Sequence, residues 1–266
     1  MSKYQQQIET AVALRGTVSI AELADMLGVS DQTIRRIVKP LEEAGRLEKI
    51  HGAIRSVHNP VTAPFQARME QNRQAKARIA TRLLDLVADG QSLAIDTGST
   101  SGFVAQALQE RRNLTVVTNS AYVACTLAMR PGNRVFMAGS QLRDHDGAAF
   151  DRAAFATIER MQVDLCILSA AQVHPSRGFL VRDQCEADIA VAMAGIAAKA
   201  IMAVDRSKFT RDNSARTIAI PHLPADLTIV TDAPPPADYA GILPPGRVVL
   251  AQGAEDGTIE ARRNQS

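Results

Sequence analysis

Residues 19–55 read SIAELADMLGVSDQTIRRIVKPLEEAGRLEKIHGAIR, and they contain two short helical patterns, a tight turn and a small basic hairpin. Ser19 and Glu22 match a capping box, in which each side chain bonds a backbone N–H that the first helical turn leaves unpaired. Apolar residues then recur at helical spacing at Ile20, Leu23, Ala24 and Leu27. Gly28 supplies the left-handed residue that ends a helix. These signals predict a short first helix.

A second helix is predicted from Ser30 onward. Its apolar positions fall on one face, at Ile34, Ile37, Val38 and Leu41. The opposite face is polar and basic and carries Gln32, Thr33, Arg35, Arg36 and Lys39. Pro40 lies inside this pattern and removes a backbone donor, so a kink or an early end of the helix after Lys39 is expected.

The order helix, turn, helix is typical of DNA-binding domains, in which the first residues of the second helix meet base edges in the major groove. Gln32 and Arg35 suit bidentate pairing with adenine and guanine, while Thr33, Arg36 and Lys39 suit phosphates. The predicted DNA-binding residues are Ser30, Gln32, Thr33, Arg35, Arg36, Lys39, His51 and Arg55. The alternative is an ordinary surface pair of helices whose charges are solvated.

A basic hairpin follows the second helix. Gly45 offers a turn, Arg46 to Ile50 lead through His51-Gly52, and Ile54-Arg55 complete the hairpin, which predicts a two-stranded wing. Between residues 33 and 55, six basic residues oppose three acidic ones, a local charge of +3, whereas the whole chain carries only +2. Nucleic-acid binding must therefore come from a local patch rather than from the field of the whole molecule.

Composition indicates a two-domain protein, since the chain has 266 residues and is 46% hydrophobic. Cys125, Cys166 and Cys185 are widely spaced and odd in number, which favours reduced thiols over disulfides or a thiolate metal site. The N-terminus lacks the apolar core of a signal peptide, and no apolar run reaches the roughly 18 residues of a membrane span. A cytoplasmic protein is predicted. The absence of Trp and the 4% aromatic content argue against broad base-stacking platforms.

Four segments are predicted along the chain. Residues 1–57 form the winged helix-turn-helix domain, and residues 58–65, with Pro60 and Pro64, form a linker. Residues 66–254 form a larger domain that opens with a helical pattern over 66–88, and residues 255–266 form a polar tail that we expect to be disordered.

The larger domain alternates short apolar runs with helical patterns. The runs lie at residues 92–96, 114–117, 134–138, 164–169, 200–204 and 227–230. Continuous apolar strands separated by helices predict an α/β domain with a mostly parallel sheet covered on both faces. The apolar stretch from Ile189 to Ala198 is expected to be a buried helix rather than a membrane span.

Polar residues follow these runs, at the carboxyl ends of strands where ligands bind in open α/β sheets. Asp96-Thr97-Gly98-Ser99-Thr100 opens a helix and offers free backbone donors to an anion, and Lys208 adds a positive charge. Carboxylates and amides nearby suit sugar hydroxyls. The predicted effector-binding residues are Asp96, Gly98, Ser99, Thr100, Thr118, Asn119, Gly139, Asp205 and Lys208.

Asp144-His145-Asp146 suggests either a metal site or a loop that closes over the ligand. The loop is favoured because three adjacent residues do not converge easily on one ion. Arg143 and His145 remain candidate ligand contacts in that loop.

Together these motifs resemble the DeoR family of bacterial transcriptional regulators nearly from end to end. The resemblance rests on Val29-Ser30 with Thr33-Ile34-Arg35-Arg36, His51-Gly52, Asp96-x-Gly98-Ser99-Thr100, Thr118-Asn119, Gly139 and Asp205-x-Ser207-Lys208-Phe209. It implies a sensor domain similar to ribose-5-phosphate isomerase and CoA-transferase-type folds. It also implies that a phosphorylated sugar or polyol relieves repression.

Two functions follow as hypotheses. The first is a repressor of a carbohydrate or polyol catabolic operon, a dimer or tetramer that binds double-stranded operator DNA and releases it when a phosphorylated sugar or polyol binds. The second is a sugar-phosphate isomerase or transferase with an accessory N-terminal domain. We favour the first, because no carboxylate has an evident acid or nucleophile beside it. No catalytic residue, metal or cofactor is predicted.

Overall fold

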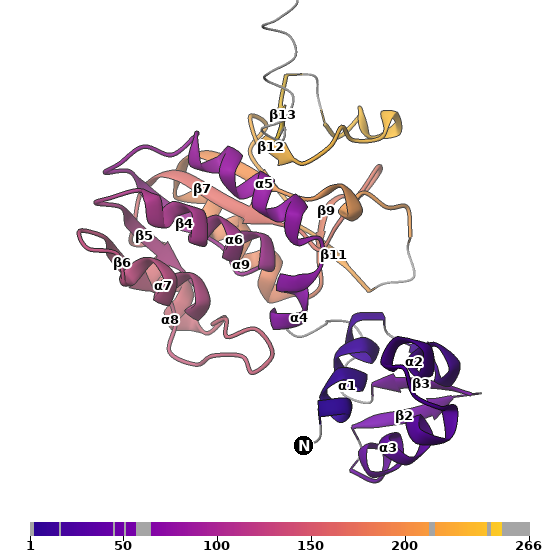
Figure 1. Ribbon diagram of the computed structural model, residues 1–266. Helices are drawn as coiled ribbons and strands as arrows, with labels where there is room; N and C mark the ends of the chain where they lie inside the picture. The colour runs from indigo at the N-terminus through magenta and orange to yellow at the C-terminus, as the bar shows by residue number, and fades with distance from the viewer. Residues whose placement is uncertain are drawn as a thin grey trace, which may run out of the picture. The chain divides into compact units, whose positions relative to one another are not determined.

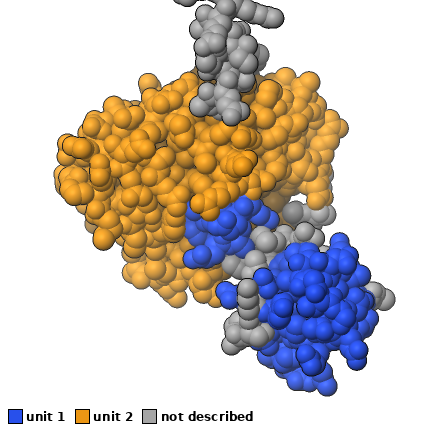
Figure 2. All heavy atoms as spheres, in the orientation of Figure 1, with its two compact units in different colours: residues 1–71 blue, residues 72–266 orange. Residues whose placement is uncertain are grey.

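The computed structural model describes residues 3–15, 17–44, 46–50, 52–56, 65–212, 216–243 and 246–251. The chain divides into two compact units, residues 1–71 and residues 72–266, which Figure 2 colours separately. Most of the expected linker, the whole of the expected tail and His51 lie outside the described residues.

Unit 1 contains the predicted helix-turn-helix. Its first three helices are α1 (Lys3–Arg15), α2 (Ile20–Leu27) and α3 (Asp31–Glu43). Ser19 and Glu22 form the expected reciprocal capping box, with Glu22 N–H donating to Ser19 Oγ at 3.1 Å and Ser19 N–H donating to Glu22 Oε2 at 2.9 Å. Gly28 ends α2 in the left-handed conformation (φ 63°), and Ser30 caps α3. The local signals of the sequence are therefore confirmed.

Pro40 does not end α3. The helix continues through Pro40 to Glu43, so the expected early end after Lys39 is wrong. Val38 and Leu41 are buried on either side of the proline, whereas Pro40 is exposed. The burial of these neighbours, about 1.5–3 kcal/mol for each large apolar side chain, offsets much of the cost of a missing N–H.

The wing is part of a three-stranded sheet with the order β1-β3-β2. Its strands are β1 (Thr17–Ser19), β2 (Leu47–Ile50) and β3 (Ala53–Ser56). The two-stranded wing expected from the sequence is thus incomplete, because β1 pairs antiparallel with β3. Helices and sheet enclose one core whose fully buried members are Ile8, Val12, Leu23 and Ile34. Neither α1 nor β1 was predicted.

Two helices occupy the pattern that the sequence assigned to residues 66–88. They are α4 (Phe65–Glu70) and α5 (Arg73–Leu84), and Asn72 between them adopts a left-handed backbone (φ 49°). The break at Gln71–Asn72 coincides with the boundary of the two units. Ile79, Leu83 and Val87 are buried, and Leu84 is half-buried.

Unit 2 is built on a seven-stranded sheet in which every neighbouring pair is parallel. The order is β13-β12-β10-β7-β4-β5-β6. Six strands match the predicted apolar runs, namely β4 (Ser92–Ile95), β5 (Thr115–Thr118), β6 (Arg134–Met137), β7 (Val163–Ser169), β10 (Ala197–Ala203) and β12 (Thr228–Thr231). The sequence did not indicate β13 (Val248–Leu250). The mostly parallel α/β fold is confirmed.

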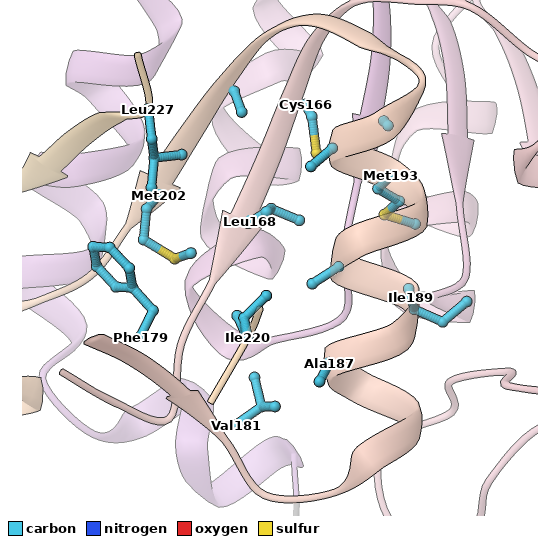
Figure 3. Packing of buried hydrophobic residues seen from close by; sticks show 14 of the residues in the cluster. Cys166, Leu168, Phe179, Val181, Ala187, Ile189, Met193, Met202, Ile220 and Leu227 are labelled. Atoms are coloured by element: carbon cyan, nitrogen blue, oxygen red, sulfur yellow. The ribbon is translucent and has the colours of Figure 1, made fainter. Parts of the chain in front are cut away.

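Helices cover both faces of this sheet (Figure 1). On one face lie α5, α6 (Ser99–Ala107) and α7 (Ala121–Ala128). The opposite face is covered by α8 (Arg152–Ile158) and α9 (Gln184–Gly195), and Figure 3 shows Met193 of α9 beside Cys166 and Leu168 of β7. The apolar stretch that begins at Ile189 is thus a buried helix followed by the start of β10.

A small antiparallel sheet packs over the same face as α9. Its order is β11-β9-β8, with β8 (Gln172–His174), β9 (Gly178–Val181) and β11 (Ile218–Ala219). Short 3₁₀ turns complete the unit at Leu108–Glu110, Arg206–Lys208 and Ala237–Tyr239. Within the described part of the chain, every helix is too short or too polar to cross a membrane.

Candidate functional site

The outward face of α3 is exposed. Gln32, Arg35, Arg36 and Lys39 are all open to solvent, whereas Ile34 on the inward face is fully buried. Among the described residues, the side chains of Gln32, Arg35 and Arg36 have no hydrogen-bond or ion-pair partner. Their donors are free to bind another molecule. Such a face matches what a DNA-reading helix needs, which is donors that a groove can satisfy.

The other predicted DNA-binding residues have local partners or fall outside the description. Ser30 Oγ accepts a hydrogen bond from Thr33 N–H at 3.3 Å and lies 3.0 Å from Thr33 Oγ1, so both serve the helix cap. Lys39 Nζ lies 3.9 Å from Glu43 in an exposed pair, which contributes little. Arg55 belongs to β3, but its side chain, like all of His51, is outside the described residues.

Arg46, one of the basic residues counted toward the wing, is part of an internal ion pair. Arg46 Nη2 lies 2.8 Å from Glu9 Oε1 and 2.9 Å from Glu9 Oε2, which joins the start of the wing to α1. Arg46 therefore helps to hold unit 1 together in addition to carrying charge.

In unit 2, the predicted effector residues lie at the carboxyl ends of four strands, β10, β4, β5 and β6, and Ser169, which was not predicted, ends the intervening strand β7. In spatial order, β10, β7, β4, β5 and β6 are followed by Asp205, Ser169, Asp96, Asn119 and Gly139. Neighbouring strands lie about 4.8 Å apart, so Asp205 and Gly139 are separated by four spacings, or roughly 19 Å. The predicted set is wider than one small sugar phosphate.

Asp96 is the most enclosed of these residues. Its carboxylate accepts hydrogen bonds from Ser101 Oγ and from Ser169, whose backbone N–H donates at 2.7 Å and whose Oγ donates at 3.0 Å. Burial raises the pKa of Asp96 to about 7, although these hydrogen bonds act in the opposite direction. Both carboxylate oxygens are thus occupied in joining β4, α6 and β7.

The start of α6 lies directly beside this carboxylate. Ser99, Thr100 and Ser101 are buried. Gly98 is required by close packing, because a Cβ at this position would meet Ser169 Oγ at 2.3 Å. Thr97 Oγ1 is buried and, in the described structure, has no hydrogen-bond partner. Backbone donors at a helix N-terminus attract anions, and α6 presents its own next to an unsatisfied hydroxyl.

Thr118 and Asn119 end the neighbouring strand β5, and both are completely buried. Thr118 Oγ1 accepts from Ser120 N–H at 3.1 Å, so it shapes the turn. Asn119 Nδ2 donates to the Ala149 carbonyl at 3.1 Å, whereas Asn119 Oδ1 is buried with no partner that the described residues supply. Asn119 therefore offers an acceptor to a ligand.

The structure gives Gly139 a packing role. Its backbone has a positive φ of 105°, and a Cβ there would lie 2.3 Å from Ala149 Cβ. Ser140, the next residue, donates through N–H and Oγ to Asp151 Oδ2 at 2.8 and 2.7 Å. These bonds hold the pKa of Asp151 well below its usual range. The polar groups of Ser140 in the turn after β6 are therefore bonded within the protein.

Asp205, after β10, is 1% exposed. Its Oδ1 accepts from Asn72 Nδ2 at 3.2 Å and from Ser207 N–H at 3.1 Å, and Asn72 Nδ2 also donates to Ser207 Oγ at 2.7 Å. Its Oδ2 is buried and finds no partner among the described residues. Lys208, which is half-buried, stands at the end of the same turn. This group fastens the first residue of unit 2 to the sheet.

The loop with Asp144, His145 and Asp146 is held by Arg143. The guanidinium donates to Asp146 at 2.5 and 3.1 Å, to Asp183 at 3.0 Å and to Glu186 at 2.8 Å. It also lies 4.4 Å from the centre of the Phe150 ring. Arg143 thus ties the loop to the start of α9. These bonds use most of its N–H donors, which leaves little for the ligand contact that was expected of it. Within the described residues no cluster of His, Cys, Asp and Glu could hold a metal ion.

A separate surface hollow of about 630 Å³ lies at the opposite end of the sheet, by the amino ends of β4, β7 and β10. Its lining includes Ser92, Glu159, Met161, Asp164 and Gly195. Asp164 there accepts from Ser92 N–H and Oγ at 2.8 and 2.7 Å. The hollow shares no residue with the predicted effector set.

Both units match models of known protein domains. Residues 5–59 match the DeoR-like helix-turn-helix domain, and residues 71–237 match the DeoR C-terminal sensor domain. The chain is 32% identical over 232 residues to the glycerol-3-phosphate regulon repressor of Escherichia coli (strain K12), covering 87% of this chain and 91% of that protein. It is 31% identical over 219 residues to the transcriptional repressor AccR of Agrobacterium fabrum, covering 81% and 83%.

An activator is also among the relatives. The L-fucose operon activator of Escherichia coli (strain K12) is 27% identical over 231 residues, covering 86% of this chain and 93% of that protein. Among solved structures, ribose 5-phosphate isomerase A from Methanocaldococcus jannaschii gives a TM-score of 0.39 at 18% identity, over 54% of this chain and 57% of that one.

Proposed function

Because this chain belongs to the DeoR family of transcriptional regulators, we propose that it represses a carbohydrate or polyol catabolic operon in the cytoplasm. A phosphorylated sugar or polyol releases it from operator DNA. The observation that carries the DNA-binding half is the outward face of α3, where Gln32, Arg35 and Arg36 are exposed and unpaired while the inward face closes the core of unit 1.

The proposed reading of DNA assigns different tasks along α3. Gln32 and Arg35, near the start of the helix, pair with adenine and guanine edges in the major groove. Arg36 and Lys39 bind phosphates, as do the residues of the wing with His51 and Arg55. Since operators for such domains are symmetric, we assign the protein a dimer or tetramer that presents two reading helices to two half-sites.

The proposed effector site centres on the start of α6. The backbone of Gly98, Ser99 and Thr100 receives the phosphate, which suits a helix N-terminus. The hydroxyls of the effector donate to Asn119 Oδ1 and Asp205 Oδ2, two buried oxygens that accept and cannot donate. Asp96 fixes the geometry of the site, and Lys208 adds positive charge.

Asn72 supports a pathway by which effector binding at this site affects the DNA-binding domain. Its side chain bonds Asp205 and Ser207, and its backbone marks the break between α4 and α5. An effector bound to Asp205 changes what Asn72 bonds, and with it the path of the chain toward residues 1–71. The effector then shifts the population of the protein away from the spacing that the operator requires.

The alternative of an isomerase or transferase has less support. A catalytic base must reach a substrate proton, but both oxygens of Asp96 accept hydrogen bonds from Ser101 and Ser169. Asp205 has one unpaired oxygen, and its other oxygen accepts from Asn72 Nδ2 and from the backbone N–H and Oγ of Ser207, bonds that hold the turn after β10.

The test is binding of the full chain to the DNA upstream of its own gene and neighbouring operons, titrated with phosphorylated sugars and polyols and with their unphosphorylated parents. We expect tight binding to one symmetric site and release by one phosphorylated compound. Sedimentation of the DNA-bound and free protein reports the oligomer. Turnover of any compound in the absence of DNA, without release of the operator, would contradict the proposal.

A further inference from the structure

Arg182 differs from Arg143 and Arg78, two other half-buried arginines of unit 2. It follows β9, and burial lowers the pKa of its guanidinium even though Glu186 and Asp183 lie close enough to act against the shift. Arg143 bonds three carboxylates, and Arg78 Nη2 donates to Asp232 at 3.1 Å. Within the described structure, the guanidinium of Arg182 has neither a hydrogen bond nor a carboxylate oxygen within ion-pair distance. None of its nitrogens is a buried atom without a partner, so its donors reach solvent and are open to a ligand.

The carboxylates beside Arg182 are already used by other groups. Asp183 accepts from Arg143 Nη1 at 3.0 Å. Glu186 accepts from Arg143 Nη2 at 2.8 Å and from the backbone N–H of Arg182 at 3.0 Å. These negative charges make the burial of Arg182 tolerable, but they do not occupy its five side-chain N–H donors.

Strand pairing brings the end of β9 close to Ser169, which packs against the start of α6. Gln172 pairs with Leu180 in the antiparallel pair of β8 and β9, and Leu180 O also accepts from Ala171 N–H at 2.8 Å, so Leu180, two residues before Arg182, lies beside the segment that follows Ser169. Ala170 directly follows Ser169, whose hydroxyl closes on Gly98 and Asp96. The charge of Glu186 acts on both Asp96 and Arg182, which agrees with this placement.

The same topology separates Lys208 from the phosphate position. β7, which ends at Ser169, is the immediate neighbour of β4, whereas β10, which leads to Asp205 and Lys208, is two strands from β4. At about 4.8 Å for each spacing, Ser169 at the end of β7 is one spacing nearer to β4 and the start of α6 than the residues that follow β10 are.

We propose that Arg182 is an effector-binding residue that holds the anionic group of the effector, a phosphate or other tetrahedral oxyanion, together with the backbone N–H groups at the start of α6. A guanidinium binds such a group through two parallel N–H donors, a geometry that Lys does not offer. This inference rests on the proposed function, since it gives the same site its main cation. Thr97, whose buried hydroxyl has no described partner, directly precedes Gly98 at the start of α6.

The experiment uses the full chain and three variants, Arg182→Ala, Arg182→Lys and Arg177→Ala. Arg177 lies on the same β8–β9 hairpin, is exposed, and donates to Thr217 O at 2.7 Å, so its removal is the matched control. Calorimetry measures binding of inorganic phosphate, of glycerol 3-phosphate and of glucose 6-phosphate, each sugar or polyol phosphate against its unphosphorylated parent. Circular dichroism verifies that each variant is folded.

We expect wild type and Arg177→Ala to bind inorganic phosphate and at least one organic phosphate alike. Arg182→Ala is expected to weaken both affinities about tenfold or more, and Arg182→Lys to recover part of that loss. Equal phosphate affinity in wild type and Arg182→Ala, or no phosphate binding by the wild type, overturns the assignment.

Release of operator DNA, measured in parallel, separates the two ideas. Phosphate binding that depends on Arg182 without release of DNA by any phosphorylated compound keeps the assignment of Arg182 and rejects the proposed function. If a phosphorylated compound releases operator DNA equally well from wild type and from Arg182→Ala, the proposed function stands and the assignment of Arg182 is rejected.

Discussion

The polar residues of α3 and those at the carboxyl ends of the large sheet have opposite surroundings. Gln32, Arg35 and Arg36 are exposed and bond nothing in the described structure. Asp96 and Asp205 are buried and joined by hydrogen bonds to other strands. The first set is available for a partner and independent of folding. The second set builds the fold and the site with the same atoms, so its mutants must be tested for stability before they are assigned to function.

The largest effect is expected from Gly139→Ala, which tests whether the sheet ends are packed as tightly as described. Its positive φ and the 2.3 Å approach of a new Cβ to Ala149 add backbone strain to overpacking. We expect the free energy of unfolding to fall by about 3 kcal/mol or more, measured by urea denaturation.

Gly178→Ala is the control for that variant. Gly178 also has a positive φ, of 77°, but a Cβ there meets nothing within 4 Å. Only the backbone cost of about 1 kcal/mol remains. Equal losses for the two variants would mean that Ala149 yields without cost.

Asp96 predicts how the stability of the full chain depends on pH. Its folded pKa of about 7 lies above the value of 3.8 for a free side chain, so the folded state binds the proton more tightly. The contribution of Asp96 to the free energy of unfolding is fully present below about pH 4 and is lost as the pH rises toward 7. Asp96→Asn, neutral throughout, should unfold with a free energy that declines less over this range.

Asp164 supplies the control of opposite sign. Hydrogen bonds from Ser92 N–H and Oγ lower its pKa, so its contribution is present above the unfolded pKa and is lost as the pH falls below it. Asp164→Asn should therefore change the free energy of unfolding only at the acid end of the pH range. The same pH profile for both variants would show that burial of Asp96 is not the cause.

On α3, Arg35→Ala should weaken binding to the operator by about 1–3 kcal/mol if Arg35 reads a guanine. Because Arg35 is exposed and has no internal partner, the unfolding free energy should stay close to that of the wild type. Fluorescence anisotropy with operator and random DNA checks this. Equal losses on the two DNAs would remove Arg35 from the base-reading set.

The smallest effect is expected for Lys39→Ala. An exposed lysine near a phosphate contributes one released counterion, so the slope of log affinity against log salt should change by about 1, with little change in specificity. Glu43→Gln is the control, since Lys39 pairs with Glu43 at 3.9 Å in an exposed position. Loss of specificity in Lys39→Ala would place it among the base-reading residues.

The helix-turn-helix could be predicted because its sequence signals act over only a few residues. Ser19, Glu22, Gly28 and Ser30 cap or end helices through atoms nearby in the chain, and their chemistry is legible in sequence. The early end of the helix expected at Pro40 was wrong because the cost of the proline is offset by tertiary burial of Val38 and Leu41. Helix α1 contains many polar residues, and its sequence pattern did not predict a helix.

In unit 2 the apolar runs predicted six strands but not their order. That order decides that Asp205 and Gly139 stand four strand spacings apart, and that Ser169 lies beside the Gly98 turn, the site that we propose Arg182 completes. Neither residue was singled out in the sequence, because a serine and an arginine after short apolar runs are ordinary there. Their importance arises only when distant strands pair.

The strand order also has a consequence for how the chain acquires its structure during synthesis. In unit 1 the pairing of β2 with β3 joins neighbouring segments, and all of residues 1–71 leave the ribosome first. The central strand β7 of unit 2 must wait for β10 and must also find β4, made long before it. Non-local pairing of this kind is slow. A nascent chain therefore completes its reading surface well before the sheet that would regulate it exists.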